Sequence, residues 1–162
     1  MPELVDRVDA HDRVIGVVDR AEAIRNAWLH RVATTAVRDR RGHFLVHRRP
    51  ATVSRFPGQY NWLLGGAVGA GESYRDAAER ELTEELGVRV VPRPVLTFLC
   101  RGEISPYWLA VHEAVVDGPV APDPGEVDWY DWLPAAALRE VMDAWPFVAD
   151  GREAFRRYEH ER

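Results

Sequence analysis

Lysine is absent from this sequence of 162 residues, and all 21 basic residues are arginine. Schiff-base chemistry, lysyl adenylation and the phosphate-binding loop that ends in a lysine all need a lysine amine, so these mechanisms are excluded. Cysteine is almost absent. The single residue, Cys100, cannot close an intrachain disulfide or build a cysteine-rich zinc site.

Long apolar runs are also missing. No segment approaches the roughly 20 apolar residues that a membrane helix needs, and residues 1–13 are mostly polar. We therefore expect a cytoplasmic protein without a signal peptide and with no membrane as its partner.

Positive charge is in short supply, since 26 acidic residues exceed the 21 basic ones and give a formal net charge of −5. This balance argues against a nucleic-acid polymer as the main partner. Hydrophobic residues make up 46% of the chain, enough for a packed core. The length predicts one domain over residues 1–162.

The hydrophobic pattern predicts strands before and after one central helix, with further helices at the end. We expect a hairpin in 4–19, a strand, turn and strand in 31–49, strands at 88–91, 95–100, 107–116 and 129–133, and helices at 73–86, 134–142 and 150–161. Ser73 and Gly87 are a typical start and end for the central helix. This order implies an α/β fold with a mixed sheet between helices.

Three glutamates share one strip of the expected central helix. Glu81, Glu84 and Glu85 stand at i, i+3 and i+4, so their carboxylates converge beside the apolar stripe of the helix. Two carboxylates ~5 Å apart repel by ~3 kcal/mol at an effective dielectric of ~20. A hard divalent cation would compensate all three, because such cations prefer oxygen ligands. A solvated acidic face is the alternative interpretation.

A glycine-rich loop leads directly into this helix. In Gly65–Gly71 the backbone can approach a phosphate or a metal closely. Glu72, at the end of the loop, can pair with Arg80 two turns along the helix. Loop and helix together favour a metal-assisted phosphate site over a solvated acidic face.

Residues 66–88 resemble the signature of the Nudix hydrolase superfamily, the Nudix box. Gly66, five residues, Glu72, seven residues and then Arg80–Val88 reproduce every defined position of that signature. The resemblance implies the Nudix fold, with a mixed sheet sandwiched between helices. It also implies metal-assisted hydrolysis of a phosphoanhydride bond in a small molecule of the nucleoside diphosphate type.

The resemblance further implies roles for particular residues. The implied ligands of Mg²⁺, with Mn²⁺ as the alternative cation, are the Gly65 carbonyl and the side chains of Glu81, Glu84 and Glu85. Arg80 and Glu72 would orient this acidic group by pairing with each other. One carboxylate would help to deprotonate the attacking water. The candidates are Glu81, Glu84 and a downstream acid, for which we choose Glu126.

Arg48 and Arg49 end an expected strand just before the loop at 50–58. Arginine suits bidentate binding of phosphate, so we expect both to bind the substrate, with a solvated strand end as the alternative. Many Nudix enzymes are dimers, and a homodimer stays open here.

A wider pattern resembles one subgroup, isopentenyl-diphosphate isomerase and its hydrolase-like relatives. It consists of His30-Arg31, Gly42, Arg48-Arg49 and Phe56-Pro57-Gly58 followed by the box. In the isomerase a histidine placed like His30 helps to bind metal, and a cysteine soon after the Pro-Gly pair is essential. Residues 58–65 contain no cysteine, so we favour a hydrolase. The alternatives are an isomerase-like enzyme and a non-catalytic domain that senses a nucleotide or ADP-ribose.

Overall fold

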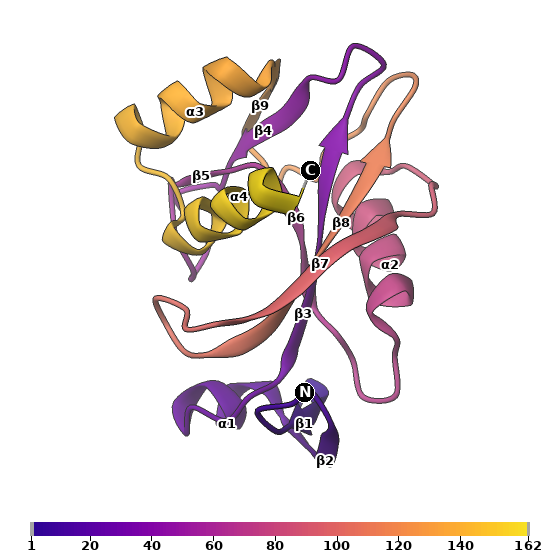
Figure 1. The fold of residues 1–162 in the computed structure, drawn as a ribbon, viewed down its shortest axis with the longest axis vertical. Coiled ribbons are helices and arrows are strands. Elements are labelled where there is room, and N and C mark those ends of the chain that lie inside the picture. Colours follow the sequence, from indigo (N-terminus) through magenta and orange to yellow (C-terminus); the bar gives the residue numbers. More distant parts are fainter. Residues whose placement is uncertain (1, 162) are drawn as a thin grey trace.

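The structure is a computed structural model that describes residues 2–161 (Figure 1). Its main feature is a mixed sheet with the strand order β5-β4-β3-β8-β7, in which β6 also pairs with β3 and β9 with β4. These strands are β3 (Arg31–Arg38), β4 (Phe44–Arg48), β5 (Tyr60–Asn61), β6 (Leu63–Ala67), β7 (Arg93–Cys100), β8 (Tyr107–Val115) and β9 (Trp129–Leu133). A separate two-stranded hairpin consists of β1 (Leu4–Val8) and β2 (Val14–Asp19).

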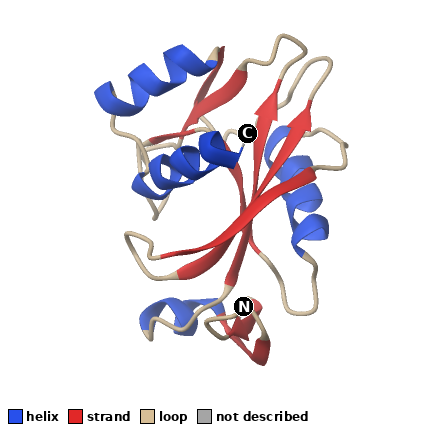
Figure 2. Cartoon of the chain, in the orientation of Figure 1, coloured by secondary structure: helices blue, strands red, loops and turns tan. Residues whose placement is uncertain are grey.

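Helices lie on both sides of the main sheet (Figure 2). They are α1 (Arg20–Arg25), α2 (Tyr74–Leu86), α3 (Ala135–Ala144) and α4 (Ala149–Glu161). In Figure 1, α2 lies on one side of the central strands, whereas α3 and α4 lie on the other. The predicted architecture, a mixed sheet between helices, is confirmed. None of the four helices is both long and apolar enough to span a bilayer, among the residues described.

Alternation along the strands divides the core into two layers. Phe44 and Val46 of β4 face an aromatic cluster under α3 and α4, whereas Leu45 between them packs with Leu82 and Leu86 of α2. Because side chains alternate across a strand, a one-residue slip would exchange the two layers. This requirement fixes the register that places α2 against the sheet.

The central helix begins and ends as its sequence predicts. The Ser73 hydroxyl accepts a hydrogen bond from the Asp76 amide at 3.0 Å, and Gly87 closes the helix in the left-handed region with φ of 67°. Only glycine adopts this conformation without strain. These caps fix where α2 begins and ends, and the burial of Leu82 and Leu86 sets which face lies on the sheet.

One detail of the sequence prediction is wrong. Residues 88–91 form no strand, and the chain re-enters the sheet only at β7.

The strand, turn and strand expected in 31–49 are confirmed as β3, the turn and β4. These two strands share the register pair Arg38 with Phe44. Most partners of β3 are distant in the sequence, because β3 also pairs with β6 and, in parallel, with β8.

Candidate functional site

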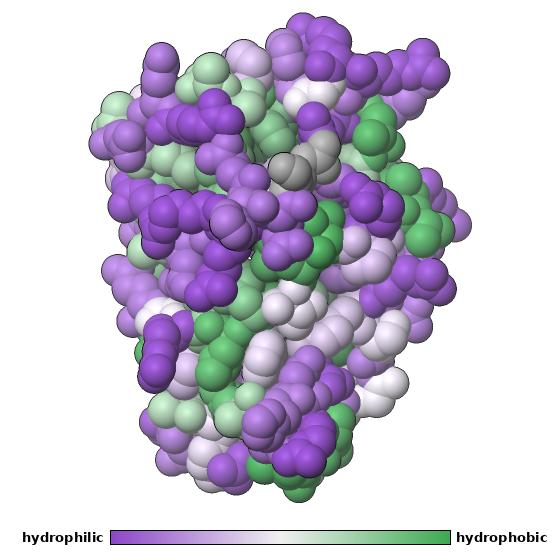
Figure 3. Space-filling model, in the orientation of Figure 1, coloured by the Kyte–Doolittle hydropathy of each residue, from purple (hydrophilic) through white to green (hydrophobic). Residues whose placement is uncertain are grey.

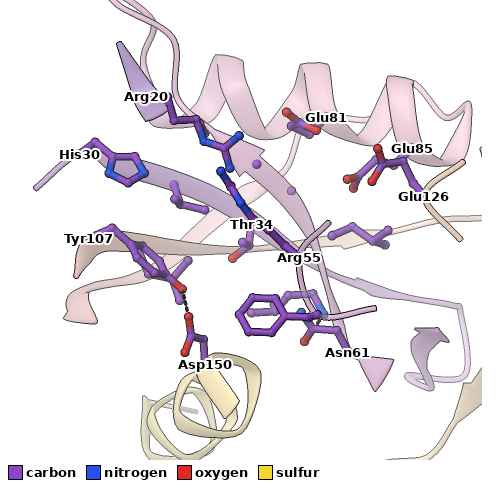
Figure 4. Close-up of a pocket in the computed structure, with 18 of the residues that line it drawn as sticks. Arg20, His30, Thr34, Arg55, Asn61, Glu81, Glu85, Tyr107, Glu126 and Asp150 are labelled. Atoms are coloured by element: carbon purple, nitrogen blue, oxygen red, sulfur yellow. Dashed lines mark hydrogen bonds between the residues drawn. The ribbon is translucent and has the colours of Figure 1, made fainter. Parts of the chain in front are cut away.

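A cleft of 1090 Å³ runs across the molecule beside β6 and the start of β3. Its walls come from the β1–β2 region, the loop at 49–56, the glycine loop at 65–72, α2, β8 and the first turn of α4. Figure 4 shows carboxylates at one end and a group containing Arg20, His30 and Tyr107 at the other. We call them the acidic end (Glu81, Glu85 and Glu126) and the far end (Arg20, His30, Tyr107 and Asp150).

The acidic end carries negative charge that the neighbouring arginines compensate only in part. Glu85 is only 8% exposed, and its Oε2 is buried without a hydrogen-bond partner among the described residues. Burial raises the pKa of Glu85 well above its usual value, and the charges of Glu81 and Glu126 raise it further. Burial likewise raises the pKa of Glu81. α2 thus places the buried carboxyl group of Glu85 at the acidic end, where a bound cation would stabilise its ionised form.

Arg80 and Glu72 tie the glycine loop to α2. The Arg80 guanidinium donates to both oxygens of Glu72, at 2.9 and 3.0 Å, and to the Ala67 carbonyl at 3.2 Å. Glu72 also accepts the Gly69 amide at 2.9 Å. The hydrogen bonds from Arg80 lower the pKa of Glu72. This fully occupied pair orients its surroundings, as the resemblance implies.

Two glycines let the loop pass close to its neighbours. A Cβ at Gly65 would lie 2.0 Å from the Ala33 carbonyl oxygen of β3, and one at Gly66 would lie 2.6 Å from Glu81 Oε1. Neither distance leaves room for a side chain. The backbone of 65–66 therefore lies directly against the acidic end, and a side chain at Gly66 would displace Glu81.

Glu84 lies at the rim of the acidic end. Its side chain is 58% exposed, and it is not among the residues that line the cleft. It connects to the group through Arg80, whose Nη1 is 3.0 Å from Glu81 Oε1 and 3.5 Å from Glu84 Oε2. The structure thus brings Glu81, Glu85 and Glu126 together, and the role of Glu84 stays a prediction.

The adjacent arginines lie in different surroundings. Arg49 lines the cleft, donates from Nε to the Arg55 carbonyl at 2.8 Å and acts on Glu85 as a nearby positive charge. Arg48 is absent from the lining and pairs with Asp128 at 2.8 Å. Adjacent residues of an extended chain point to opposite sides, which explains the difference. Arg49 is therefore placed to contact a substrate in the cleft, whereas Arg48 is not.

The far end contains residues that the motif did not indicate. The Arg20 Nε is buried and unpartnered among the described residues, as is Nδ1 of His30. Burial lowers the pKa of His30, and the positive charge of Arg20 lowers it further. Across the cleft, the Tyr107 hydroxyl donates to Asp150 at 2.6 Å (Figure 4). The sequence singled out His30 but gave no spacing signal for Arg20.

The acidic end suits a divalent cation by the type of its ligands. An unpartnered buried carboxylate oxygen, two further carboxylates and the nearby backbone of Gly65 are the oxygen donors that Mg²⁺ and Mn²⁺ prefer. Within residues 2–161, however, no group of three or more His, Cys, Asp or Glu side chains already has the arrangement of a metal cage. Glu81, held by Arg80, would have to turn to bind a cation.

Known proteins are similar to this chain in sequence and in fold. A model of the NUDIX domain matches residues 28–158. The chain is 44% identical over 158 residues to an uncharacterized Nudix hydrolase, SCO1686, of Streptomyces coelicolor, covering 96% of this chain and 87% of that protein. The crystal structure of DR0079 from Deinococcus radiodurans is similar with a TM-score of 0.83 and 29% identity, covering 96% and 99% of the two chains. The chain therefore belongs to the Nudix family.

Within this family the chain is an enzyme of the Nudix hydrolase class, as its similarity to named Nudix hydrolases shows. It is also 32% identical over 147 residues to an isopentenyl-diphosphate Delta-isomerase of Burkholderia multivorans, covering 88% of this chain and 84% of that protein. Cys100 is buried in β7 and does not line the cleft. The cysteine of the isomerase has no counterpart in the described lining.

Proposed function

We propose that this Nudix hydrolase cleaves a phosphoanhydride bond in a small molecule of the nucleoside diphosphate type, with Mg²⁺ as its cofactor and Mn²⁺ as the alternative. One domain, residues 1–162, carries the whole activity. The expected cytoplasmic location stays a prediction. The observation that supports the proposal most is the buried Glu85 carboxylate beside Glu81 and Glu126, whose Oε2 has no hydrogen-bond partner among the described residues.

In this proposal the acidic end holds the cation. Glu85, Glu81, Glu84 and the Gly65 carbonyl are its ligands. When bound, the cation neutralises diphosphate oxygens and lowers the pKa of a water molecule. The charge balance agrees with this role, because three carboxylates in one pocket would otherwise repel an anionic substrate.

The remaining residues position the substrate and move the proton. Arg49 binds phosphate oxygens from the lining of the cleft. Arg55 and Arg20 line the same cleft (Figure 4). Glu126 accepts the proton of the attacking water, with Glu84 as the alternative base. The water oxygen bonds to phosphorus, and the bridging P–O bond breaks to release a phosphate. Glu72 and Arg80 hold the loop and helix in place throughout.

A substrate panel tests this function. Purified protein with Mg²⁺ or Mn²⁺ is incubated with nucleoside triphosphates, dinucleoside polyphosphates, nucleotide sugars and ADP-ribose, and released phosphate, diphosphate and nucleoside monophosphate are measured. We expect cation-dependent release from at least one compound. Absence of turnover with both cations across the panel would contradict the proposal.

Two further measurements address the alternatives. A sensor would bind ADP-ribose or a nucleotide in calorimetry without consuming it. An isomerase would interconvert the two five-carbon isoprenoid diphosphates, which we expect to fail because no cysteine lines the described part of the cleft.

A further inference from the structure

Phe56, in the loop at 49–56 that lines the cleft, has a backbone conformation that phenylalanine rarely adopts. Its φ is 48°, in the left-handed region, where a bulky side chain is strained. It also precedes Pro57, and a residue before proline is normally extended. Strained residues of this kind persist only where the surrounding structure fixes them, and they cluster at ligand-binding sites.

The chain on both sides of Phe56 holds it in this conformation. The Arg49 amide donates to the Gln59 carbonyl at 2.9 Å, and the Gly58 amide donates to the Arg49 carbonyl at 3.0 Å. Arg49 Nε donates to the Arg55 carbonyl at 2.8 Å. Gly58, with φ of 72°, forms the corner of a turn that the Gln59 amide closes on the Phe56 carbonyl at 3.2 Å. These bonds fix the backbone of Phe56 against its strain.

The ring of Phe56 contributes to the cleft and not to the hydrophobic core. Phe56 is half-buried and lines the cleft, belongs to none of the three core clusters and makes no ring–ring contact with a described residue. Tyr107, the other Phe, Tyr or Trp residue of the described lining, packs against the core and donates its hydroxyl to Asp150. Tyr60 packs on Trp145, with ring centroids 4.6 Å apart, outside that lining.

We propose that the base of the substrate stacks on the Phe56 ring, which thereby selects substrates that carry a heteroaromatic base. This inference rests on the proposed function, because it takes the cleft as the substrate site. Stacking on an aromatic side chain is open to every base, because every base has a π-face. Since the backbone of Phe56 is fixed before the substrate arrives, little conformational entropy is lost when the ring binds.

The polar groups of the lining favour a nucleoside over an alkyl chain as the occupant. Arg20 Nε is buried without a hydrogen-bond partner among the described residues, and Asn61 and Ser54 also line the cleft. An alkyl chain would leave such a buried donor unpartnered, which is costly. A nucleoside offers hydroxyl groups and ring nitrogens that can accept from it, together with a flat ring for Phe56.

The test is calorimetry on the full chain with Mg²⁺, which needs no turnover. The four nucleoside monophosphates are compared with ribose 5-phosphate, which has the same sugar and phosphate but no base. We expect wild type to bind the mononucleotides at least about tenfold more tightly, within the range of one base–aromatic stack. Phe56→Asn should reduce this preference to about twofold or less. Phe56→Trp should keep it, because the ring is retained.

Asparagine is chosen because it tolerates the left-handed conformation, so the Tm of Phe56→Asn should equal or exceed that of wild type. Phe56→Leu is the second variant. It keeps an apolar side chain but removes the ring, and should also lose most of the preference. These two variants separate stacking from folding and from simple apolar contact.

A control for general surface hydrophobicity is needed, because Figure 3 shows hydrophobic residues scattered among polar ones over the face that it presents. Tyr130→Ala removes an aromatic ring that is 38% exposed on β9 and outside the cleft lining, and it should keep the full preference.

No preference for mononucleotides in wild type, or the same preference in Phe56→Asn, would overturn the inference. So would weakening of a five-carbon isoprenoid diphosphate, instead of the mononucleotides, by Phe56→Asn. Failure of the proposed function is distinguishable from these results. Cation-dependent turnover without a preference that depends on Phe56 would overturn only the base stack, whereas such a preference without turnover of any compound would support the stack and contradict hydrolysis.

Discussion

The two ends of the cleft hold their charges in opposite ways. At the acidic end Glu85 is buried beside two further carboxylates, and its Oε2 has no hydrogen-bond partner among the described residues. At the far end the charges are shared among several elements. Arg20 lies 3.3 Å from Glu3, and Asp150 of α4 accepts the Tyr107 hydroxyl of β8. The acidic end therefore keeps electrostatic repulsion that a ligand can relieve, whereas the charges of the far end are largely neutralised by its own residues.

The largest expected effect comes from the acidic end. Glu85→Gln removes the buried charge and should lower turnover by about a hundredfold or more, which corresponds to roughly 3 kcal/mol of transition-state stabilisation. The fold should remain intact because the amide has the same shape. Steady-state kinetics with Mg²⁺ measure the effect.

Glu79→Gln is the matched control. It changes the same residue type on the same helix but lies outside the cleft lining. It should leave turnover within about twofold of wild type. An effect of Glu85→Gln below about threefold would remove Glu85 from the site.

The adjacent arginines offer the next comparison. Arg49→Ala should lower kcat/KM by about tenfold or more, because a charge-assisted hydrogen bond to phosphate is lost. Arg48→Ala should change it by about twofold or less, because Arg48 pairs with Asp128 outside the cleft lining. Equal losses in the two variants would contradict the placement of these side chains.

A smaller effect concerns stability against pH at the acidic end. Because the pKa of Glu85 is raised in the folded chain, the unfolded chain loses this proton at a lower pH. Without a cation, the stability of the wild type relative to Glu85→Gln should therefore fall as the pH rises above 4.5. Thermal melts with a chelator measure this difference, and added Mg²⁺ should reduce it. A difference independent of pH would contradict the burial of an ionisable group here.

The far end should show the opposite dependence. The pKa of His30 is lowered from 6.5, so below this value the unfolded chain binds a proton that the folded chain does not. The stability of wild type relative to His30→Gln should fall as the pH decreases from 6.5. The exposed His11 on the β1–β2 turn gives the control variant, His11→Gln, whose profile should follow wild type. If His30→Gln kept the wild-type acid profile, burial of a neutral histidine would be refuted.

Local signals in the sequence predicted the helix that carries Glu81 and Glu85. The spacing of Glu81 and Glu85, the cap at Ser73 and the terminator Gly87 are all local features of one helix, and local features determine that helix. Glu126 reaches the same place from a distant loop, and only the family resemblance indicated it.

The far end could not be predicted in this way. Arg20 follows β2 without a motif, and its place in the cleft depends on how the hairpin packs against the glycine loop. The choice between Arg48 and Arg49 depends on one strand register, and the failed strand at 88–91 had apolar residues but no neighbour with which to pair. The position of Arg20, the different surroundings of Arg48 and Arg49, and the lack of a strand at 88–91 all depend on long-range packing, which the local sequence does not encode.

The most direct measurement of the central claim is cation binding by the protein itself, without substrate. Mn²⁺ titration followed by electron paramagnetic resonance, with Mg²⁺ as competitor, compares wild type, Glu85→Gln and Glu79→Gln. We expect wild type and Glu79→Gln to bind one ion with similar affinity and Glu85→Gln to bind it at least about tenfold more weakly. Equal binding by all three proteins, or none by wild type, would contradict the claim that the buried carboxylate holds a divalent cation.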